Sequence, residues 1–189
     1  MSNPRIYQNQ TFMVGDSFPL DDDGFSHLIR VLRLTNGDTM TLFNGGCIDG
    51  KYFEYSGELV NVSKKNADVK IVSCTEKKVE SPLSIHLGQG ISRGDRMDFT
   101  LQKSVELGVN TITPLFTERC GVKLNAERLA KKRDQWQKIV ISACEQSGRC
   151  HVPEVKDPIS LQAWLAQDTS ALKLNLHPKA EHSIMTLPE

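Results

Sequence analysis

Thiol and imidazole side chains gather at the end of a long amphipathic segment, where Cys144, Cys150 and His151 follow Cys120. Such side chains are the usual zinc ligands, and paired ligands are typically separated by two to four residues. Five residues separate Cys144 from Cys150, and Cys144 falls on the apolar stripe of its segment. The spacing therefore predicts buried thiols and no metal site.

Cys120 stands beside Arg119 and close to Lys123, two cations of the kind that lower the pKa of a thiol. A nucleophile also needs a base, and the sequence places no His, Asp or Asn next to it, so we expect a bystander. The five cysteines are an odd number without C-x-x-C spacing, which favours reduced, mostly buried thiols in a cytoplasmic protein. No apolar run exceeds four residues, so neither an export signal nor a membrane span is expected.

Glycines at 88, 90 and 94 lie between an expected strand and an expected helix, the place where phosphate-binding turns occur. Their spacing is not that of the dinucleotide-binding fingerprint, and Asp95 and Asp98 already compensate the positive end of the helix. A plain strand-to-helix turn is the better interpretation, with dinucleotide binding as the alternative.

The basic side chains carry more information as a set. The whole chain is neutral, with 23 basic and 23 acidic residues, but residues 81–153 contain 11 basic and 7 acidic groups. Arginines at the ends of elements suit bidentate phosphate contacts and stacking on unpaired bases. The candidates for RNA binding are Arg30, Arg33, Arg93, Arg96, Arg119 and Arg149. For Lys131, Lys132 and Lys138 a solvated helix face is the preferred interpretation.

Two domains are expected to position these groups. Residues 1–73 contain short strand-like runs, among them 39–43, 51–55, 58–62 and 67–71, with a turn at 44–46, and this spacing predicts a small β-barrel. A short helix over 25–33, with Leu28, Val31 and Leu32 at helical spacing, would cover one mouth and turn its arginines outward.

A polar stretch at 74–82 predicts a linker, and residues 83–189 alternate strands with helices, which predicts an α/β domain with a parallel sheet. Strands are expected at 83–87, 109–115 and 171–176. Helices are expected after a cap at Ser92, over 126–147 and over 160–167. Residues Met97, Leu101, Ser104 and Val105 form one buried stripe; Trp136, Ile139, Val140, Ala143 and Cys144 form the other.

Several stretches resemble one family when taken together. They are Phe-Thr-Leu-Gln-Lys-Ser-Val-Glu-Leu-Gly-Val at 99–109, Ile-Thr-Pro at 112–114, Glu-Arg-Cys at 118–120, Glu-Gln-Ser-Gly-Arg at 145–149 and Leu-Asn-Leu-His-Pro at 174–178. With His27, the Val-Leu-Arg at 31–33 and Gly37-Asp38, they make the chain similar over essentially its whole length to the RsmE family. That family comprises bacterial 16S ribosomal RNA uridine N3-methyltransferases.

The resemblance implies a PUA-like β-barrel that helps hold small-subunit rRNA, followed by a SPOUT α/β methyltransferase domain. The SPOUT domain binds S-adenosyl-L-methionine at a C-terminal knot and pairs as a homodimer. The cofactor wall would come from Leu174, Asn175, Leu176, His177 and Pro178. The family's Gly-Pro-Glu-Gly-Gly turn and its final loop do not occur in the 189 residues, so we expect a C-terminally incomplete domain that lacks most of the cofactor site. The resemblance assigns no catalytic residue. A non-catalytic RNA-binding module remains the alternative.

Overall fold

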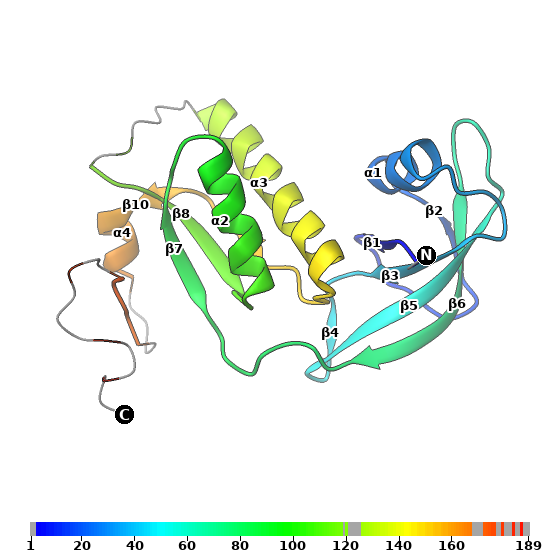
Figure 1. The fold of residues 1–189 in the computed structure, drawn as a ribbon, viewed down its shortest axis with the longest axis horizontal. Helices are drawn as coiled ribbons and strands as arrows, with labels where there is room; N and C mark the ends of the chain where they lie inside the picture. The colour runs from blue at the N-terminus through cyan, green and yellow to red at the C-terminus, as the bar shows by residue number, and fades with distance from the viewer. Residues whose placement is uncertain are drawn as a thin grey trace.

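The computed structural model describes residues 3–118, 120, 126–167, 172–176, 179, 183 and 186. Two units lie side by side in it, a β-rich unit that contains the N terminus and the short helix α1, and an α/β unit with the helices α2, α3 and α4 (Figure 1). The segment that follows β6 (Asp68–Lys77) joins them. β6 continues past residue 73, where the sequence places the end of the first domain.

One mixed sheet builds the first unit, in the order β1-β3-β5-β6-β2, with β4 paired to β5. β1 runs parallel to β3, and the other neighbours are antiparallel. The bounds of its other strands are β1 (Arg5–Tyr7), β2 (Ser17–Pro19), β3 (Thr39–Phe43), β4 (Cys47–Ile48) and β5 (Lys51–Val60). The strand-rich character of residues 1–73 is therefore confirmed.

β5 is one ten-residue strand where the sequence suggested two. Gly57, which the sequence treats as an interruption, lies inside it at a bulge in the pairing with β6. A β-carbon at Gly57 would lie 2.5 Å from Cγ1 of Val69 and would also overlap Leu42, so the bare backbone lets two strands curl over the barrel core.

The tight hairpin turn is at Asp49-Gly50, not at residues 44–46 as the sequence predicted. Both turn residues have positive φ, 51° and 76°, and they join Ile48 to its partner Lys51. Two positive φ values in a two-residue loop are what the twist of a β-hairpin requires, and Asp-Gly meets that requirement.

The short helix over 25–33 has a different winding from the one expected. α1 (Asp22–Phe25) begins at Asp21, whose Oδ1 accepts a hydrogen bond from Gly24 N at 2.7 Å, and continues into a π-helix, η1 (Ser26–Val31). Leu28 is fully buried, but Val31 is 66% exposed and Leu32 43% exposed. The wider π turn breaks the 3.6-residue period, so the expected burial of Val31 and Leu32 is wrong.

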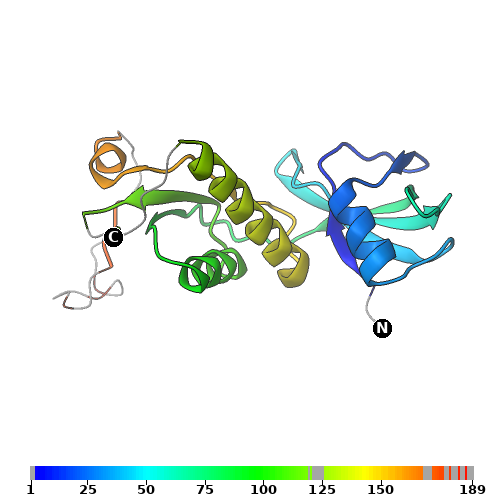
Figure 2. The same cartoon turned by 90° about the horizontal axis from the view of Figure 1, so that it is seen from above.

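The second unit contains a parallel sheet in the order β10-β8-β7, with β9 on the same edge of β8 as β10. α2 and α4 lie on opposite faces of it, and α3 packs against α2 (Figure 2). Its strands are β7 (His86–Gly90), β8 (Thr111–Phe116), β9 (Glu154–Val155) and β10 (Ile159–Ser160); its helices are α2 (Asp95–Glu106), α3 (Ala126–Ser147) and α4 (Leu161–Leu165). The predicted parallel sheet is confirmed.

Apolar spacing predicted the two long helices well. The four residues expected to line α2 are its buried residues, and α3 has the predicted bounds with Trp136 1% exposed at its centre. The start of α2 differs, because Gly94, with φ 51°, occupies the N-cap position instead of Ser92.

Two strand predictions differ from the structure. Leu83 and Ile85 precede β7, which begins at His86, and both are exposed. Gly88, which the sequence places after the strand, lies inside it, and a β-carbon there would come within 2.6 Å of the Trp164 ring of α4. At the other end, residues 172–176 form no strand, and residue 171 lies outside the described residues.

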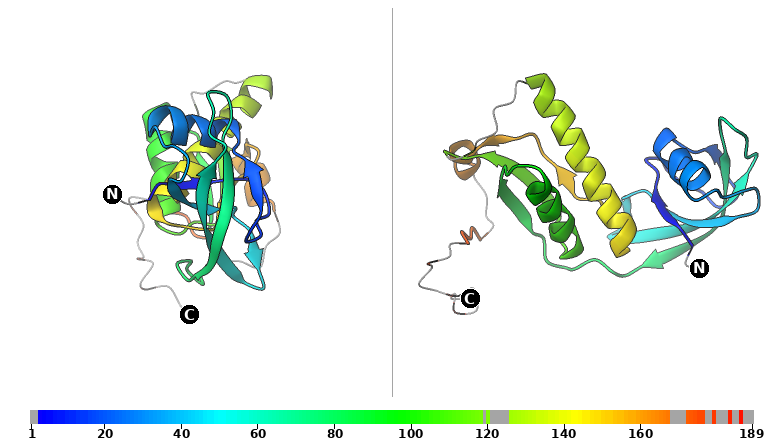
Figure 3. Two further views of the ribbon diagram at one scale, coloured as in Figure 1. Left: turned by 90° about the vertical axis from the view of Figure 1, so that its right-hand side faces the viewer. Right: turned by 45° about the horizontal axis from the view of Figure 1, so that its top comes forward.

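The two units share a polar interface around Arg5, at the start of β1. Its guanidinium donates to Glu54 Oε1 at 2.7 Å within the barrel and to the carbonyls of Cys144 and Arg149, at 2.7 and 2.9 Å, in the second unit. Its ring neighbour is Phe43, 3.8 Å away. One side chain of the barrel thus binds the C-terminal end of α3, which lies next to β1 (Figure 3).

Further contacts extend this interface on both sides. Glu145 on α3 accepts a hydrogen bond from Tyr7 N at 3.0 Å, and Tyr52 of β5 contacts Nδ1 of His151 at 3.1 Å. Phe43, fully buried at the end of β3, packs within the core of the second unit and not with the barrel core. The two units therefore hold one fixed orientation, set by directional hydrogen bonds and a shared apolar residue.

Candidate RNA interface and cofactor wall

Arg30 and Arg33 lie at the end of the π-helix, on the outer surface of the barrel unit. The Arg30 guanidinium stands 5.3 Å from the Phe25 ring centroid, and both arginines are exposed. Arg33 adopts a left-handed φ of 59° and follows directly on the turn in which Leu32 N bonds to His27 O. This backbone turn directs two cations to the surface without an ion pair among the described residues, as phosphate contacts require.

Arg93 and Arg96 lie where β7 passes into α2. Both are exposed, and neither forms an ion pair within the described part of the chain. The left-handed Gly94 between them makes the turn from strand to helix. α1 and α2 lie on opposite sides of α3 in two views, so the two arginine pairs form separate patches and not one cluster (Figures 1 and 3).

Arg149, a predicted RNA-binding residue, is buried in the structure. Its side chain is buried, donates to the carbonyls of Val105 and Val109 at 2.9 and 2.7 Å, and pairs with Glu80 at 2.8 Å. Glu80 also accepts hydrogen bonds from the backbone N–H groups of Cys150 and His151. The fork of this arginine is filled by protein acceptors, so Arg149 is a structural residue and no RNA contact.

Of the three α3 lysines expected on a solvated face, Lys131 and Lys138 are exposed and Lys132 is half-buried. Lys131 pairs with Glu127 at 2.7 Å in an exposed i,i+4 bridge, and Lys132 lies over the Trp136 ring. Lys138 reaches Asp23 of α1 at 2.7 Å, which makes it an exposed bridge between the two units. Arg119, the remaining arginine of the predicted set, lies outside the described residues.

The expected cofactor wall is only partly described. Leu174 and Leu176 are 46% and 86% exposed, Asn175 between them is exposed, and His177 and Pro178 lie outside the described residues. Two apolar side chains and one amide are suitable neighbours for a purine ring, and all three are exposed. The structure describes only these three of the five residues expected to form the wall, and we derive no catalytic step through S-adenosylmethionine.

Cysteine burial is divided. Cys144 and Cys150 are buried, whereas Cys47 and Cys74 are exposed, so the expectation of mostly buried thiols is wrong for the barrel cysteines. Burial raises the pKa of the Cys144 thiol to about 12, which keeps it protonated and unsuited to nucleophilic attack or zinc binding. In the described ranges, no group of three or more His, Cys, Asp or Glu side chains is arranged to hold a metal ion.

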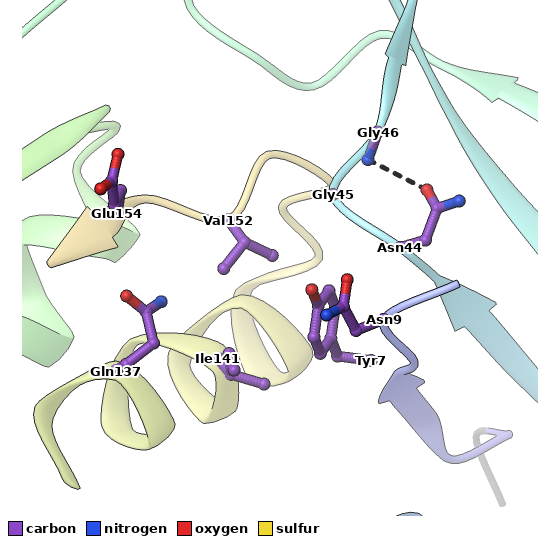
Figure 4. A pocket seen from close by; sticks show the side chains of 9 residues that line it. All are labelled: Tyr7, Asn9, Asn44, Gly45, Gly46, Gln137, Ile141, Val152 and Glu154. Atoms are coloured by element: carbon purple, nitrogen blue, oxygen red, sulfur yellow. Dashed lines mark hydrogen bonds between the residues drawn. The ribbon is translucent and has the colours of Figure 1, made fainter. Parts of the chain in front are cut away.

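An open groove lies between the two units, with a volume of about 480 Å³ (Figure 4). The barrel lines it from one side and α3 with the segment leading into β9 from the other. The residues around it are Tyr7, Asn9, Asn44, Gly45, Gly46, Gln137, Ile141, Val152 and Glu154. Sequence analysis missed this feature, because its residues come from four distant segments and none belongs to a recognisable motif.

Comparison with known proteins fits this architecture. A model of the RNA methyltransferase domain matches residues 79–189, and a model of the RNA methyltransferase PUA domain matches residues 20–72. The ribosomal RNA small subunit methyltransferase E of Buchnera aphidicola from Schizaphis graminum is 37% identical over 98% of this chain, which spans 74% of that protein. This chain belongs to the ribosomal RNA small subunit methyltransferase E family.

Solved structures of two similar proteins contain the methyl donor. A putative methyltransferase from Legionella pneumophila, in complex with S-adenosylmethionine, superposes with a TM-score of 0.93 and 42% identity over 100% of this chain and 76% of its own. The ribosomal RNA small subunit methyltransferase E of Neisseria gonorrhoeae, bound to S-adenosyl methionine, superposes with a TM-score of 0.82 and 45% identity. The match covers 89% of this chain and 67% of that protein. The predicted fold class, a PUA-like unit followed by an α/β methyltransferase unit, is confirmed.

Within this methyltransferase E chain, the residues that sequence analysis missed are those that fix the two units together. Arg5, Glu80 and Glu145 each bind groups far away in the sequence, with separations of up to 145 residues. Their only signal in the sequence is a charge at a strand start, in a linker and on a helix. No described helix is long and apolar enough to cross a membrane.

Proposed function

We propose that the full-length gene product methylates N3 of a uridine in small-subunit ribosomal RNA, in the cytoplasm and as a homodimer of SPOUT methyltransferase domains. The observation that carries the proposal is the fixed union of an RNA-binding type of barrel with a methyltransferase unit, in a chain 37% identical to a protein named as a ribosomal RNA small subunit methyltransferase. The homologous structures with bound S-adenosylmethionine support that compound as the methyl donor.

The RNA side of the reaction is assigned to exposed arginines. N3 is on the pairing edge of uridine, so the target base has to be unpaired or extruded, which costs a few kcal/mol that RNA contacts must offset. Arg30 and Arg33 on the barrel, and Arg93 and Arg96 at the start of α2, are exposed and form no ion pair with another described residue, so their guanidinium groups are available for phosphate contacts. Because the units are fixed, two patches would bind two separate stretches of one RNA.

On the donor side, the proposal includes Leu174, Asn175 and Leu176, with His177 and Pro178, as one wall of the site. S-adenosylmethionine would supply an electrophilic methyl group there. What this chain itself contributes is orientation: the barrel and the methyltransferase unit hold the RNA in a fixed position relative to the donor. Holding two reactants in the right geometry supplies much of the rate acceleration of an enzyme.

The decisive experiment is methyl transfer by the full-length gene product. Small-subunit rRNA and assembled small subunits are each incubated with methyl-labelled S-adenosylmethionine, and the labelled nucleoside is identified by mass spectrometry. N3-methyluridine at one position, visible also as a reverse-transcription stop because its pairing edge is blocked, supports the proposal. Tight RNA binding with no methyl transfer would favour the alternative, a non-catalytic RNA-binding module. Methylation of another atom would refute the assignment to N3.

A further inference from the structure

The groove between the two units offers hydrogen-bonding groups that the protein leaves free. Tyr7 and Ile141 line it from β1 and α3, and Val152, Asn9 and Glu154 complete this part of its lining (Figure 4). The Tyr7 hydroxyl and the Asn9 amide make no hydrogen bond to any described residue. The groove thus combines an aromatic ring and two aliphatic side chains with polar groups at its edge.

The other polar side chains of the groove serve to keep its walls in place. Asn44 accepts a hydrogen bond from Gly46 N at 3.0 Å and donates to Gln10 O, and Gln137 bonds to Pro153 O and Val155 N at 3.0 and 2.9 Å. Tyr7 N is held by Glu145 of α3. A site whose walls are already fixed loses little conformational entropy when a ligand binds.

Glycine at position 45 lets the barrel backbone pack against the second unit at the edge of the groove. Gly45 has a left-handed φ of 73°, and a β-carbon there would lie 3.3 Å from Cγ2 of Val152. The barrel backbone therefore approaches the second unit closely at this point, and it exposes peptide groups alongside the Tyr7 ring. Flat polar rings with apolar faces are the ligands that such surroundings accept.

Charge decides which kind of ligand fits. The lining contains no Lys, Arg or His, and its one ionised side chain is Glu154, whose Oε2 pairs with Lys156 while the second oxygen has no partner among the described residues. The lining therefore offers no cation to an anionic group such as a phosphate or a carboxylate. Burial raises the pKa of the Tyr7 phenol, so its hydroxyl stays neutral and able both to donate and to accept. The groove selects a neutral ring that presents N–H donors.

From this chemistry we propose that the interdomain groove binds an unpaired nucleobase of the RNA, which stacks against Tyr7 and donates an N–H group to Glu154. The proposal rests on the proposed function, since it takes RNA as the ligand. The base is a neighbour in the same RNA and not the methylated uridine, because the groove lies at the C-terminal half of α3 and not at the loops that follow β7 and β8. It adds a recognition site to the two arginine patches.

A double-mutant cycle between protein and RNA tests this. The RNA is a small-subunit rRNA fragment that the full-length protein binds, together with copies in which one unpaired nucleotide at a time is made abasic. The variants are Glu154→Gln, which removes only the charge of an exposed side chain, and Ile141→Trp, which fills the groove. Glu127→Gln is the matched control, because Glu127 is also an exposed glutamate that pairs with a lysine, and it lies on α3 outside the groove lining.

One abasic position should weaken binding to the wild-type protein by about fivefold to tenfold, as the loss of a stacked base does. Ile141→Trp should lower the affinity for intact RNA by a similar factor, and its affinity should not fall further when that position is abasic. Glu154→Gln should show a smaller loss coupled to the same position, and Glu127→Gln none. If Ile141→Trp does not fold, Glu154→Gln still decides.

The proposal is overturned if no abasic position couples to either groove variant, or if Glu127→Gln loses as much affinity as Glu154→Gln. It is also overturned if the groove variants keep full RNA affinity and instead weaken binding to a small-subunit protein. Failure of the proposed function is seen separately: a wild-type protein that transfers no methyl group refutes that function, whereas normal methylation by both groove variants with unaltered RNA affinity refutes only the groove.

Discussion

Arginines at the interface between the units and arginines on the outer surface differ in the partners that their guanidinium groups find. Arg5 and Arg149 bind carbonyl and carboxylate oxygens from segments far along the chain, and both are largely shielded from water. Arg33 and Arg93 are exposed and unpaired within the described residues. Identical side chains therefore serve folding in one region and are available for RNA in the other, and the difference is created by long-range contacts.

The largest effect should follow loss of Arg149. Arg149→Ala leaves the carboxylate of Glu80 buried without its cation and frees two backbone carbonyls. Breaking one side of a buried ion pair destabilises proteins by about 3–5 kcal/mol. Urea unfolding should report a loss of that order. An unfolding free energy within error of the wild type would show that Arg149 does not stabilise the fold and behaves like the exposed arginines.

Trp136→Ala comes next and tests the core that supports both regions. Trp136 is 1% exposed in the middle of α3, so its removal should lower the free energy of unfolding by about 3–5 kcal/mol, as other large aromatic truncations do. RNA affinity, measured at a temperature where the variant is folded, should stay near the wild-type value. A folded variant that has lost RNA binding would mean that this face of α3 contacts RNA.

Arg5→Lys tests the interface arginines by keeping the positive charge and removing the several N–H donors of the guanidinium group. A lysine cannot reach Glu54 and two carbonyls of the second unit together, so we expect a loss of about 1.5–3 kcal/mol, the range for hydrogen bonds to charged groups. Calorimetry measures this loss. Rescue of full stability by lysine would show that charge alone matters at this position.

The surface arginines should give the smallest change in stability and a specific change in RNA binding. Arg33→Ala and Arg93→Ala should each reduce the magnitude of the slope of log affinity against log salt concentration by about one. The reason is that RNA binding releases about one counterion fewer for each phosphate contact that is lost. Fluorescence anisotropy over a salt series measures the slope. Lys131→Ala, whose lysine is paired with Glu127, should leave it unchanged. Equal slopes in all three variants would place these arginines among ordinary solvated residues.

Local sequence patterns predicted what depends on neighbours along the chain. The bounds of α3 and the buried stripe of α2 follow from apolar spacing, and the sheet follows from alternating elements. The patterns failed where a distant partner or an unusual winding decides. Val31 is exposed because a π-helix replaces the α-helix, and Arg149 is buried because Glu80 and two carbonyls from α2 and its end surround it.

The same limit applies to the candidate site. Arg30, Arg33, Arg93 and Arg96 were predicted at element ends, and they are exposed there. Their separation into two patches on either side of α3 is a property of the domain orientation, which no local pattern encodes. The groove escaped prediction for the same reason: Tyr7 and Ile141 are 134 residues apart and become neighbours only through the interface.

Phe43 has a consequence for how the protein can be divided. This residue belongs by sequence to the barrel, yet its side chain completes the apolar interior of the methyltransferase unit. A protein cut in the connecting segment would leave one half with an exposed phenyl ring and the other with a hole of the same size. Neither half is thus an autonomous folding module, and heating the intact chain should melt both together in a single cooperative transition.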